Sequence, residues 1–184
     1  MTAPLETEIR TERLLLRPLA AADAPAIERL AGDERVARLT ARLPHPYPAG
    51  AAEAFIAMAL GQERGGAGRW FAITRADGPD ALLGVIGLEA DDDGTVEIGY
   101  WLGVPAWGQG LMSEAVPAVV AFARQWRPGA RIAAHTFPEN VASQRVLEKA
   151  GFRRNGVGVC QAPARDRKTV RNAPLFVFAP DETA

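Results

Sequence analysis

The 184-residue sequence has one cysteine and two histidines, and this scarcity excludes several kinds of site. Cys160 alone cannot form an intramolecular disulfide, and a cysteine-based zinc site would have too few ligands. His45 and His135 lie far apart in the chain. We therefore expect no metal, and we expect Cys160 to be a buried, inert thiol because β-branched residues precede it.

The sequence also lacks long apolar runs and an excess of either charge. Its longest nearly apolar stretches have about ten residues, whereas a membrane-spanning helix needs about 20. Lysines and arginines number 21 against 22 aspartates and glutamates, so the net charge of -1 gives no overall positive field for a nucleic acid or an anionic membrane. The first residues do not resemble a signal peptide. We expect a cytoplasmic protein that binds neither nucleic acid nor membrane.

Repeats, low-complexity tracts and long linkers are missing as well, which favours a single domain over residues 1–184 with an ordered core at about 12–179. Hydrophobic residues make up 48% of the sequence, enough for such a domain to bury its own core. A monomer and a homodimer are both compatible with this composition.

The pattern of apolar residues predicts alternating helices and strands. Three- and four-residue spacings predict helices over residues 21–30 and 108–126. N-cap residues and helix-favouring composition predict further helices over residues 33–39, 51–63 and 140–150. Runs rich in β-branched and aromatic residues predict strands over residues 13–18, 69–75, 81–90, 95–104, 131–137, 152–161 and 170–178. The order indicates an α/β (α+β) fold with a mixed, mostly antiparallel sheet of about six or seven strands flanked by helices.

The segment YWLGVPAWGQGLMSEA (residues 100–115) leads from a predicted strand through a glycine-containing turn into a helix. The start of a helix offers unpaired backbone N–H groups and the positive end of the helix dipole, and glycines let a phosphate approach closely. A plain turn explains the glycines equally well. The dinucleotide-binding fingerprint lacks its third glycine, and no Gly-Lys-Ser/Thr of a Walker loop follows.

A second informative segment is NVASQRVLEKAGF (residues 140–152). On a helix, Asn140, Ser143 and Leu147 share one stripe, while Arg145 and Lys149 share another. Polar groups and cations therefore face different parts of one ligand. The alternative is that Asn140 only caps the helix and the two cations form a solvated face.

Together these segments resemble the GNAT superfamily of acetyl-CoA-dependent N-acetyltransferases, and within it the ribosomal-protein alanine/serine N-terminal acetyltransferase group. The resemblance runs from residue 11 to residue 178. It is carried by three stretches in order: EIGYWL (97–102), WGQGLMSEA (107–115) and N-x-x-S-x-RVLEK-x-GF (140–152).

The resemblance implies acetyl-CoA as co-substrate and a splay between the fourth and fifth strands that admits its pantetheine arm. It assigns the coenzyme pyrophosphate to main-chain amides of the turn, namely those of Gly108, Gln109, Gly110, Leu111 and Met112. It also implies that Asn140 binds the pantetheine amide or a water and that Ser143 donates a hydrogen bond to the departing thiolate. Arg145 is expected to approach the coenzyme phosphates. Lys149 either does the same or only faces solvent.

Three positions depart from the superfamily pattern. Trp107 stands where Gln or Arg is expected, and Met112 stands where a small residue is expected. A cradle of main-chain amides tolerates both changes. Leu147 occupies the position of the tyrosine that serves many members as the acid for the thiolate, so this sequence needs a different donor.

Direct attack of an amine on the thioester requires a base or a water chain to take the amine proton. Strand alternation places Glu97 on one face with Gly99 and Trp101, so Glu97 is a candidate base, and Glu89 is a weaker one. Glu97 is otherwise a structural strand carboxylate. The predicted acceptor is a protein N-terminal amine; alternatives are a small-molecule amine (aminoglycoside, amino acid or polyamine), a non-catalytic acyl-CoA-binding module and a ligand-free dimerisation protein.

Overall fold

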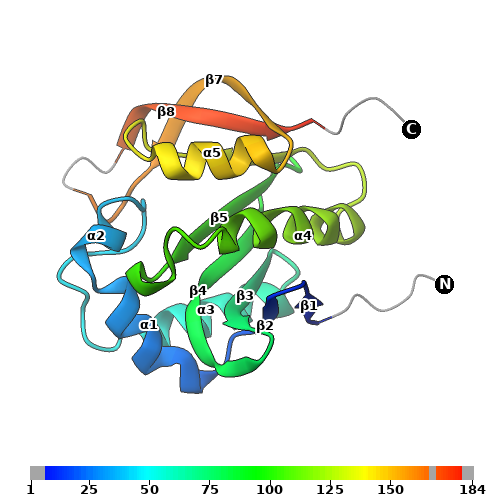
Figure 1. Cartoon of the computed structure of the whole chain (residues 1–184). Coiled ribbons are helices and arrows are strands. Elements are labelled where there is room, and N and C mark those ends of the chain that lie inside the picture. The colour runs from blue at the N-terminus through cyan, green and yellow to red at the C-terminus, as the bar shows by residue number, and fades with distance from the viewer. Residues whose placement is uncertain (1–6, 166–168, 180–184) are drawn as a thin grey trace.

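The computed structural model describes residues 7–165 and 169–179, which form one twisted sheet with helices on both faces (Figure 1). The described strands are β1 (Ile9–Arg10), β2 (Leu14–Pro18), β3 (Gly68–Arg75), β4 (Gly78–Ala90), β5 (Val96–Leu102), β6 (Ile132–His135), β7 (Phe152–Gln161) and β8 (Thr169–Phe178). The helices are η1 (Ala21–Asp23), α1 (Ala24–Ala31), α2 (Glu34–Ala37), α3 (Ala51–Arg64), η2 (Val104–Ala106), α4 (Leu111–Trp126) and α5 (Val141–Lys149).

This architecture confirms the predicted fold class, with small differences at the element ends. The described part of the sheet has eight strands, because the two-residue β1 was too short to leave a pattern in the sequence. Helix α4 begins at Leu111 instead of residue 108, since Gly108 and Gly110 have φ angles of 72° and 73°, which are incompatible with a right-handed helix. β4 begins at Gly78, three residues before the strand predicted over residues 81–90.

The order of strands in the sheet is β1-β2-β3-β4-β5-β6-β8-β7, and every neighbouring pair is antiparallel except β5 and β6. These two parallel strands pair only at Val96 with Ile132 and at Glu97 with Ala133. Beyond Glu97 the two strands separate. They correspond to the fourth and fifth strands predicted from the sequence, over residues 95–104 and 131–137, so the predicted splay is confirmed. In the described chain, the outer edge of β5 after Glu97 has no partner strand.

Two apolar clusters hold the helices against opposite faces of the sheet. Helices α4 and α5 cover one face, where Leu111, Val116 and Leu147 are fully or almost fully buried. Helices α1 and α3 cover the other face through Ile27 and Ile56. Burying each such side chain contributes about 1.5–3 kcal/mol relative to exposing it. The sheet thus lies between two layers of helices.

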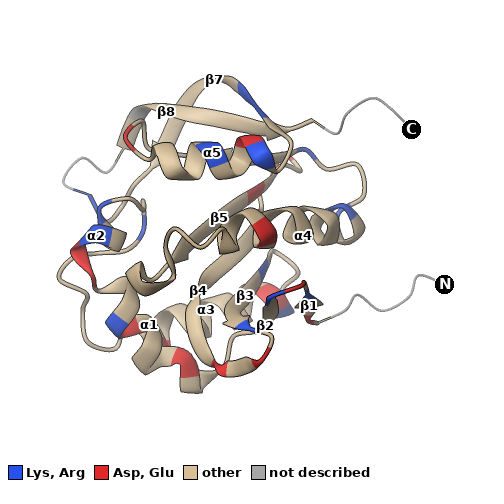
Figure 2. Cartoon of the chain, viewed as in Figure 1, with Lys and Arg blue, Asp and Glu red and all other residues tan. Residues whose placement is uncertain are grey.

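Charged residues of both signs are spread over helices, strands and loops, as the near-zero net charge implies (Figure 2). One ion pair is largely buried: Arg17 Nη2 lies 2.7 Å from Asp23 Oδ1 and joins β2 to η1. Among the described helices, none has the length and apolar character that crossing a membrane requires.

Candidate active site

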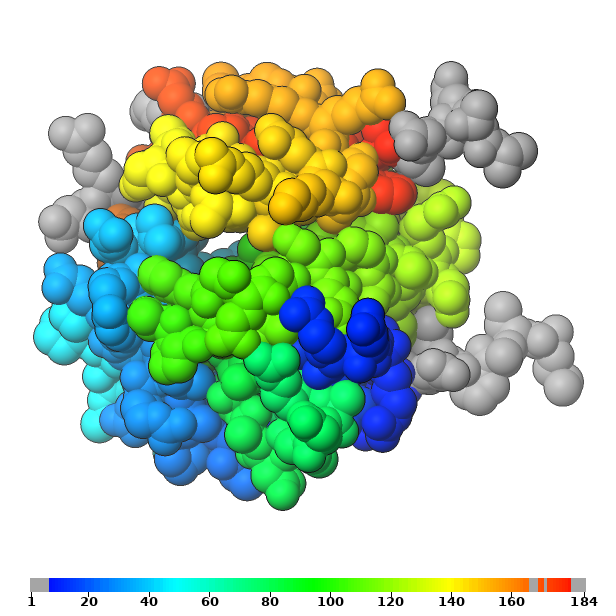
Figure 3. All heavy atoms as spheres, in the orientation of Figure 1, coloured from blue at the N-terminus to red at the C-terminus, as the bar shows by residue number. Residues whose placement is uncertain are grey.

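A cavity of about 680 Å³ opens where β5 and β6 separate. Its walls come from four segments: residues 36–40 in and after α2, residues 100–102 of β5, residues 106–113, and residues 140–149 around α5. The surface is visibly hollowed between α2, α5 and the segment that leads into α4 (Figure 3). The two motifs found in the sequence therefore face one another across a single cavity.

The floor of this cavity includes the start of α4. Gly110 is the N-cap residue of α4, and the helix has no side-chain cap, so the amides of its first turn have no intrahelical acceptor. A Cβ on Gly108 would meet nothing within 4 Å, and a Cβ on Gly110 would come no closer than 3.7 Å to Arg13. The positive φ angles, and not crowding, are what require glycine at both positions. This geometry suits an anion bound to backbone amides.

Gln109 supports the turn from behind. Its side-chain Nε2 donates to the carbonyl of Pro105 at 2.8 Å, its Oε1 accepts from Arg75, and its own carbonyl accepts from Arg13 Nη1 at 2.9 Å. The side chain is not part of the cavity wall. Since Gln109 does not line the cavity, a contact between its main-chain N–H and a coenzyme stays a prediction.

Arg13 is anchored in turn by Glu114 in the first turn of α4. Arg13 Nε lies 2.6 Å from Glu114 Oε2, and Thr11 donates to Glu114 Oε1 at 2.5 Å. Burial raises the pKa of the Glu114 carboxyl, but the hydrogen bonds from Thr11 and Arg13 outweigh it and lower the pKa overall. Sequence reasoning missed Arg13 and Glu114 because about 100 residues separate them.

Asn140 caps α5, as one of the two sequence interpretations predicts. Its Oδ1 accepts from the Ser143 amide at 3.1 Å, and its Nδ2 donates to the carbonyl of Leu39 at 3.2 Å. Both polar ends of the side chain are thus engaged within the protein, and they tie α5 to the segment after α2. Asn140 still lines the cavity.

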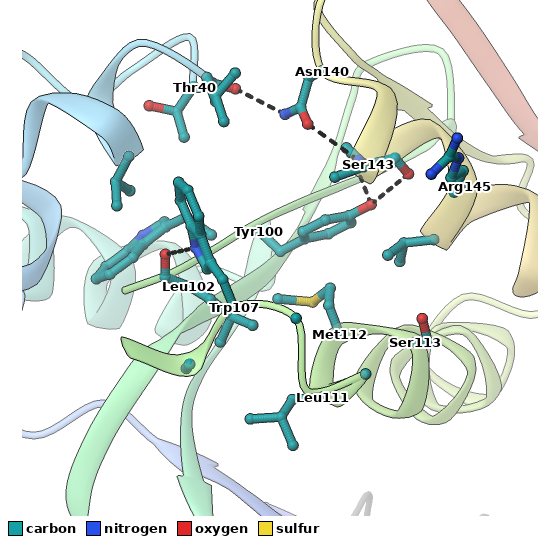
Figure 4. Close-up of a pocket in the computed structure, with 18 of the residues that line it drawn as sticks. Thr40, Tyr100, Leu102, Trp107, Leu111, Met112, Ser113, Asn140, Ser143 and Arg145 are labelled. Atoms are coloured by element: carbon teal, nitrogen blue, oxygen red, sulfur yellow. Dashed lines mark hydrogen bonds between the residues drawn. The ribbon is translucent and has the colours of Figure 1, made fainter. Parts of the chain in front are cut away.

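Ser143 lies on the cavity wall next to Tyr100 of β5 (Figure 4). The Tyr100 hydroxyl is 3.0 Å from Ser143 Oγ and 3.4 Å from the Ser143 carbonyl oxygen. Burial raises the pKa of Tyr100 to about 12, although the hydrogen bond with Ser143 acts in the opposite direction. Leu147, at the position where the resemblance implies a tyrosine, is completely buried in the core.

Arg145 and Lys149 are exposed and contribute to the rim of the cavity. Within residues 7–165 and 169–179, neither side chain forms a salt bridge. Both cations thus border the same cavity as the start of α4. Sequence reasoning placed both residues on one helical stripe.

Glu97 does not line this cavity. Tyr100 faces α5, so alternation along β5 directs Glu97 to the opposite face of the sheet, together with Trp101. Glu97 Oε1 lies 3.0 Å from His135 Nδ1, and the side chain is 35% exposed. Its backbone forms the last paired position before the splay. The two predicted catalytic residues, Glu97 and Ser143, thus belong to opposite faces of the sheet.

Glu89 lies directly opposite Glu97 in the register of β4 and β5. Its carboxylate pairs with Arg42 at 2.5 Å and accepts from Gln62 Nε2 at 3.2 Å. Each of these two neighbouring carboxylates therefore has a basic group of its own beside it. In the described residues, no group of three or more His, Cys, Asp or Glu side chains is arranged to hold a metal ion.

The family is decided by a comparison of the chain with known protein families. Residues 13–153 match the acetyltransferase (GNAT) domain. The chain belongs to the GNAT acetyltransferase family. The matched segment contains the splay, the start of α4 and helix α5, and it covers well over half of the sequence.

Two relatives from Bacillus subtilis (strain 168) support this assignment. The "Uncharacterized N-acetyltransferase YoaA" is 35% identical over 153 residues, covering 81% of this chain and 84% of that protein. The "Probable N-acetyltransferase YjcK" is 41% identical over 81 residues, which are 42% of this chain and 45% of that protein. The match to YjcK thus spans less than half the length of that relative.

Solved structures share the fold. The ribosomal L7/L12 alpha-N-protein acetyltransferase RimL in complex with coenzyme A has a TM-score of 0.75 at 20% identity, with 96% of this chain and 99% of that chain covered. The microcin C7 self-immunity acetyltransferase MccE in complex with acetyl-CoA and AMP has a TM-score of 0.75 at 16% identity, with 92% and 94% covered. At these identities the likeness concerns the fold alone.

Proposed function

We propose that this GNAT acetyltransferase moves an acetyl group from acetyl-CoA to a primary amine, with a protein N-terminal amine as the preferred acceptor. The observation that carries the proposal is the single cavity at the splay, which joins an unpaired strand edge, an uncapped helix start and the Ser143 hydroxyl. These three features match three parts of the coenzyme: a pantetheine arm with amide groups, a pyrophosphate and a thioester sulfur.

In the proposed complex, the pyrophosphate binds the main-chain amides of residues 108–112. Arg145 supplies a charge-assisted contact to the coenzyme phosphates. The pantetheine arm follows the free edge of β5 past Asn140, and its sulfur reaches Ser143. Acetyl-CoA supplies the activated acyl group when it binds.

The amine nitrogen then attacks the thioester carbonyl carbon, a C–N bond forms and the C–S bond breaks. Ser143 donates a hydrogen bond to the departing thiolate, which takes its proton from solvent after release. The amine loses one proton, and we propose Glu97 as the base, acting directly or through a water.

The position of Glu97 supports this role. It lies at the last paired position of β5, at the point where the splay begins, and on the face of the sheet opposite Ser143. The coenzyme and the acceptor would then approach the thioester carbon from opposite faces. His135 holds the carboxylate in place at 3.0 Å.

The choice of acceptor rests on the likeness of three motifs to the ribosomal-protein N-terminal acetyltransferases, and RimL shares the fold of this chain. A small-molecule amine is the second candidate, because MccE, whose structure holds AMP together with acetyl-CoA, shares the fold at the same TM-score as RimL. The remaining alternative, a non-catalytic acyl-CoA-binding module, would bind acetyl-CoA without transferring the acetyl group to any amine.

An acceptor panel tests the proposal. Acetyl-CoA is mixed with peptides that begin with Ser or Ala, the same peptides with a blocked N-terminus, spermidine and an aminoglycoside. Free thiol is followed in time and products are weighed by mass spectrometry. We expect turnover with the free peptides and none with their blocked controls. Turnover confined to the small amines would overturn the choice of acceptor, and tight acetyl-CoA binding with no turnover would identify a binding module.

A further inference from the structure

We propose that Tyr100 is a positioning residue for acetyl transfer, because its phenol holds the Ser143 hydroxyl so that the Ser143 proton points into the cavity. The inference rests on the proposed function of the same cavity. It supplies a role for the tyrosine on β5 whose hydroxyl contacts Ser143.

Ser143 is fixed from two directions. Asn140 Oδ1 accepts from its backbone amide at 3.1 Å, and the Tyr100 hydroxyl reaches its Oγ at 3.0 Å from the strand on the other side of the cavity (Figure 4). The first contact sets the start of α5, and the second selects the orientation of the hydroxyl. Neither contact depends on a ligand.

A count of protons shows the consequence. Two hydroxyl groups carry two protons, and the hydrogen bond between them uses one. If Tyr100 donates, the Ser143 proton is free to turn toward the cavity. If Ser143 donates instead, the phenol proton is left with only the Ser143 carbonyl at 3.4 Å as its acceptor in the described chain. A phenol is the better donor and an aliphatic hydroxyl the better acceptor, so the first arrangement is favoured.

Tyr100 acts without losing its own proton. Because burial raises the pKa of Tyr100 to about 12, the phenol stays neutral at physiological pH. Its transfer of a proton to the sulfur would leave a buried phenolate, which is costly. Tyr100 therefore contributes by hydrogen bonding: it polarises Ser143, and Ser143 stabilises the negative charge that grows on sulfur when the C–S bond breaks.

The substitution Tyr100→Phe removes a single oxygen and tests the inference. We expect kcat to fall about 3- to 10-fold, the effect of one lost hydrogen bond, while the Kd for acetyl-CoA changes less than about 2-fold. The double variant Tyr100→Phe/Ser143→Ala should be no slower than Ser143→Ala alone, because Tyr100 acts only through Ser143. The matched control is Tyr47→Phe at the other tyrosine of the sequence, which packs in the cluster between α1, α3 and the sheet and should keep full kcat.

Three results would overturn the inference: an unchanged kcat in Tyr100→Phe, a double variant whose loss equals the product of the two single losses, or a loss confined to coenzyme binding. Urea unfolding of each variant verifies that it is folded. If Tyr100→Phe does not fold, 3-fluorotyrosine incorporated in the Tyr47→Phe background makes Tyr100 a stronger donor without changing its shape. In that protein a changed kcat at constant coenzyme affinity supports the inference, and an identical kcat overturns it.

These outcomes separate the inference from the proposed function. A wild-type chain that releases no thiol with any amine contradicts the proposed function itself. Wild-type turnover that Tyr100→Phe leaves intact contradicts only the role of Tyr100.

Discussion

The substitution Gly110→Val tests whether the start of α4 binds the coenzyme. Gly110 has a φ of 73°, a left-handed conformation that costs an L-residue about 1–2 kcal/mol and a β-branched residue more. The surrounding space would accept a side chain, since the nearest atom to an added Cβ is Arg13 Nη2 at 3.7 Å. Valine therefore relieves its strain by rotating the peptide units of the turn, which turns the amides of residues 108–112 away from the cavity.

The size of the effect follows from the contacts at risk. A hydrogen bond from an amide to a charged phosphate contributes about 1.5–3 kcal/mol, so losing two of them costs about 3–6 kcal/mol. Because about 1.4 kcal/mol corresponds to a tenfold change in Kd, we expect acetyl-CoA to bind more than about 100-fold more weakly. Isothermal titration calorimetry with acetyl-CoA measures this change directly.

Gly94→Val is the matched control. Gly94 lies in the turn between β4 and β5 with a φ of 84°, and nothing lies within 4 Å of its added Cβ. Both variants carry comparable backbone strain, so urea unfolding should show similar losses of stability. Only Gly110→Val should lose coenzyme affinity. A folded Gly110→Val protein that binds acetyl-CoA as tightly as the wild type would refute the assignment of the turn.

Three further predictions concern contacts around the site and in the core. Arg13→Leu removes the donor to the Gln109 carbonyl, so the Kd for acetyl-CoA should rise about 3- to 10-fold in calorimetry; an unchanged Kd would show that Arg13 does not hold the turn. Ser143→Ala should lower kcat about 10-fold or more with little change in coenzyme affinity. A kcat equal to that of the wild type would show that water, and not Ser143, donates to the departing thiolate. Burial raises the pKa of the Asp23 carboxyl, but hydrogen bonds from Arg17 and the Ala20 amide outweigh it and lower the pKa overall. The ionised Asp23 therefore stabilises the folded protein at a pH above the pKa that Asp23 has in the unfolded chain. This stabilisation is lost as the pH falls through the lower pKa of the folded state. Urea unfolding at pH 7 and pH 3 should show that loss in the wild type and less of it in Asp23→Asn, and equal losses would exclude Asp23 as its source.

Most of the fold could be predicted because each long element has its own local pattern. Helix α4 buries residues at three- and four-residue spacings, and the apolar runs of β3, β4 and β5 are separated by turn residues. β1 escaped prediction because two residues carry no periodicity. The start of α4 was placed three residues early, because the composition of residues 108–110 does not reveal that both glycines adopt a positive φ.

The site was predictable where its residues form contiguous motifs, and hidden where contacts join distant segments. Gly110 and Ser143 stand in motifs that the sequence displays directly. Tyr100 and Ser143 are 43 residues apart, and Arg13 and Gln109 are 96 apart, so their hydrogen bonds depend on how β5 and β2 are placed in the sheet. From the sequence, only strand alternation indicates that Tyr100 lies on the face of β5 opposite Glu97. No other feature of the sequence points to a contact between Tyr100 and Ser143.

The proposed role of Glu97 as the base can be tested by the substitution Glu97→Gln. An N-terminal amine has a pKa of about 8, so at neutral pH most of the acceptor is protonated and must lose a proton before or during attack. Glu97→Gln keeps the size of the side chain and a carbonyl that accepts from His135, but it removes the basic charge. If Glu97 is the base, kcat should fall at pH 7, and part of the loss should be recovered as rising pH supplies more free amine.

Glu89→Gln is the control for this experiment, because Glu89 lies opposite Glu97 on the neighbouring strand and its own partner is Arg42. We expect the larger loss in Glu97→Gln. If instead Glu89→Gln shows the larger loss together with the change in pH profile, the base is Glu89. If Glu97 only holds His135 in place, Glu97→Gln preserves that hydrogen bond, and both the rate and its pH profile remain those of the wild type. That last result would remove Glu97 from the mechanism and leave proton transfer to water.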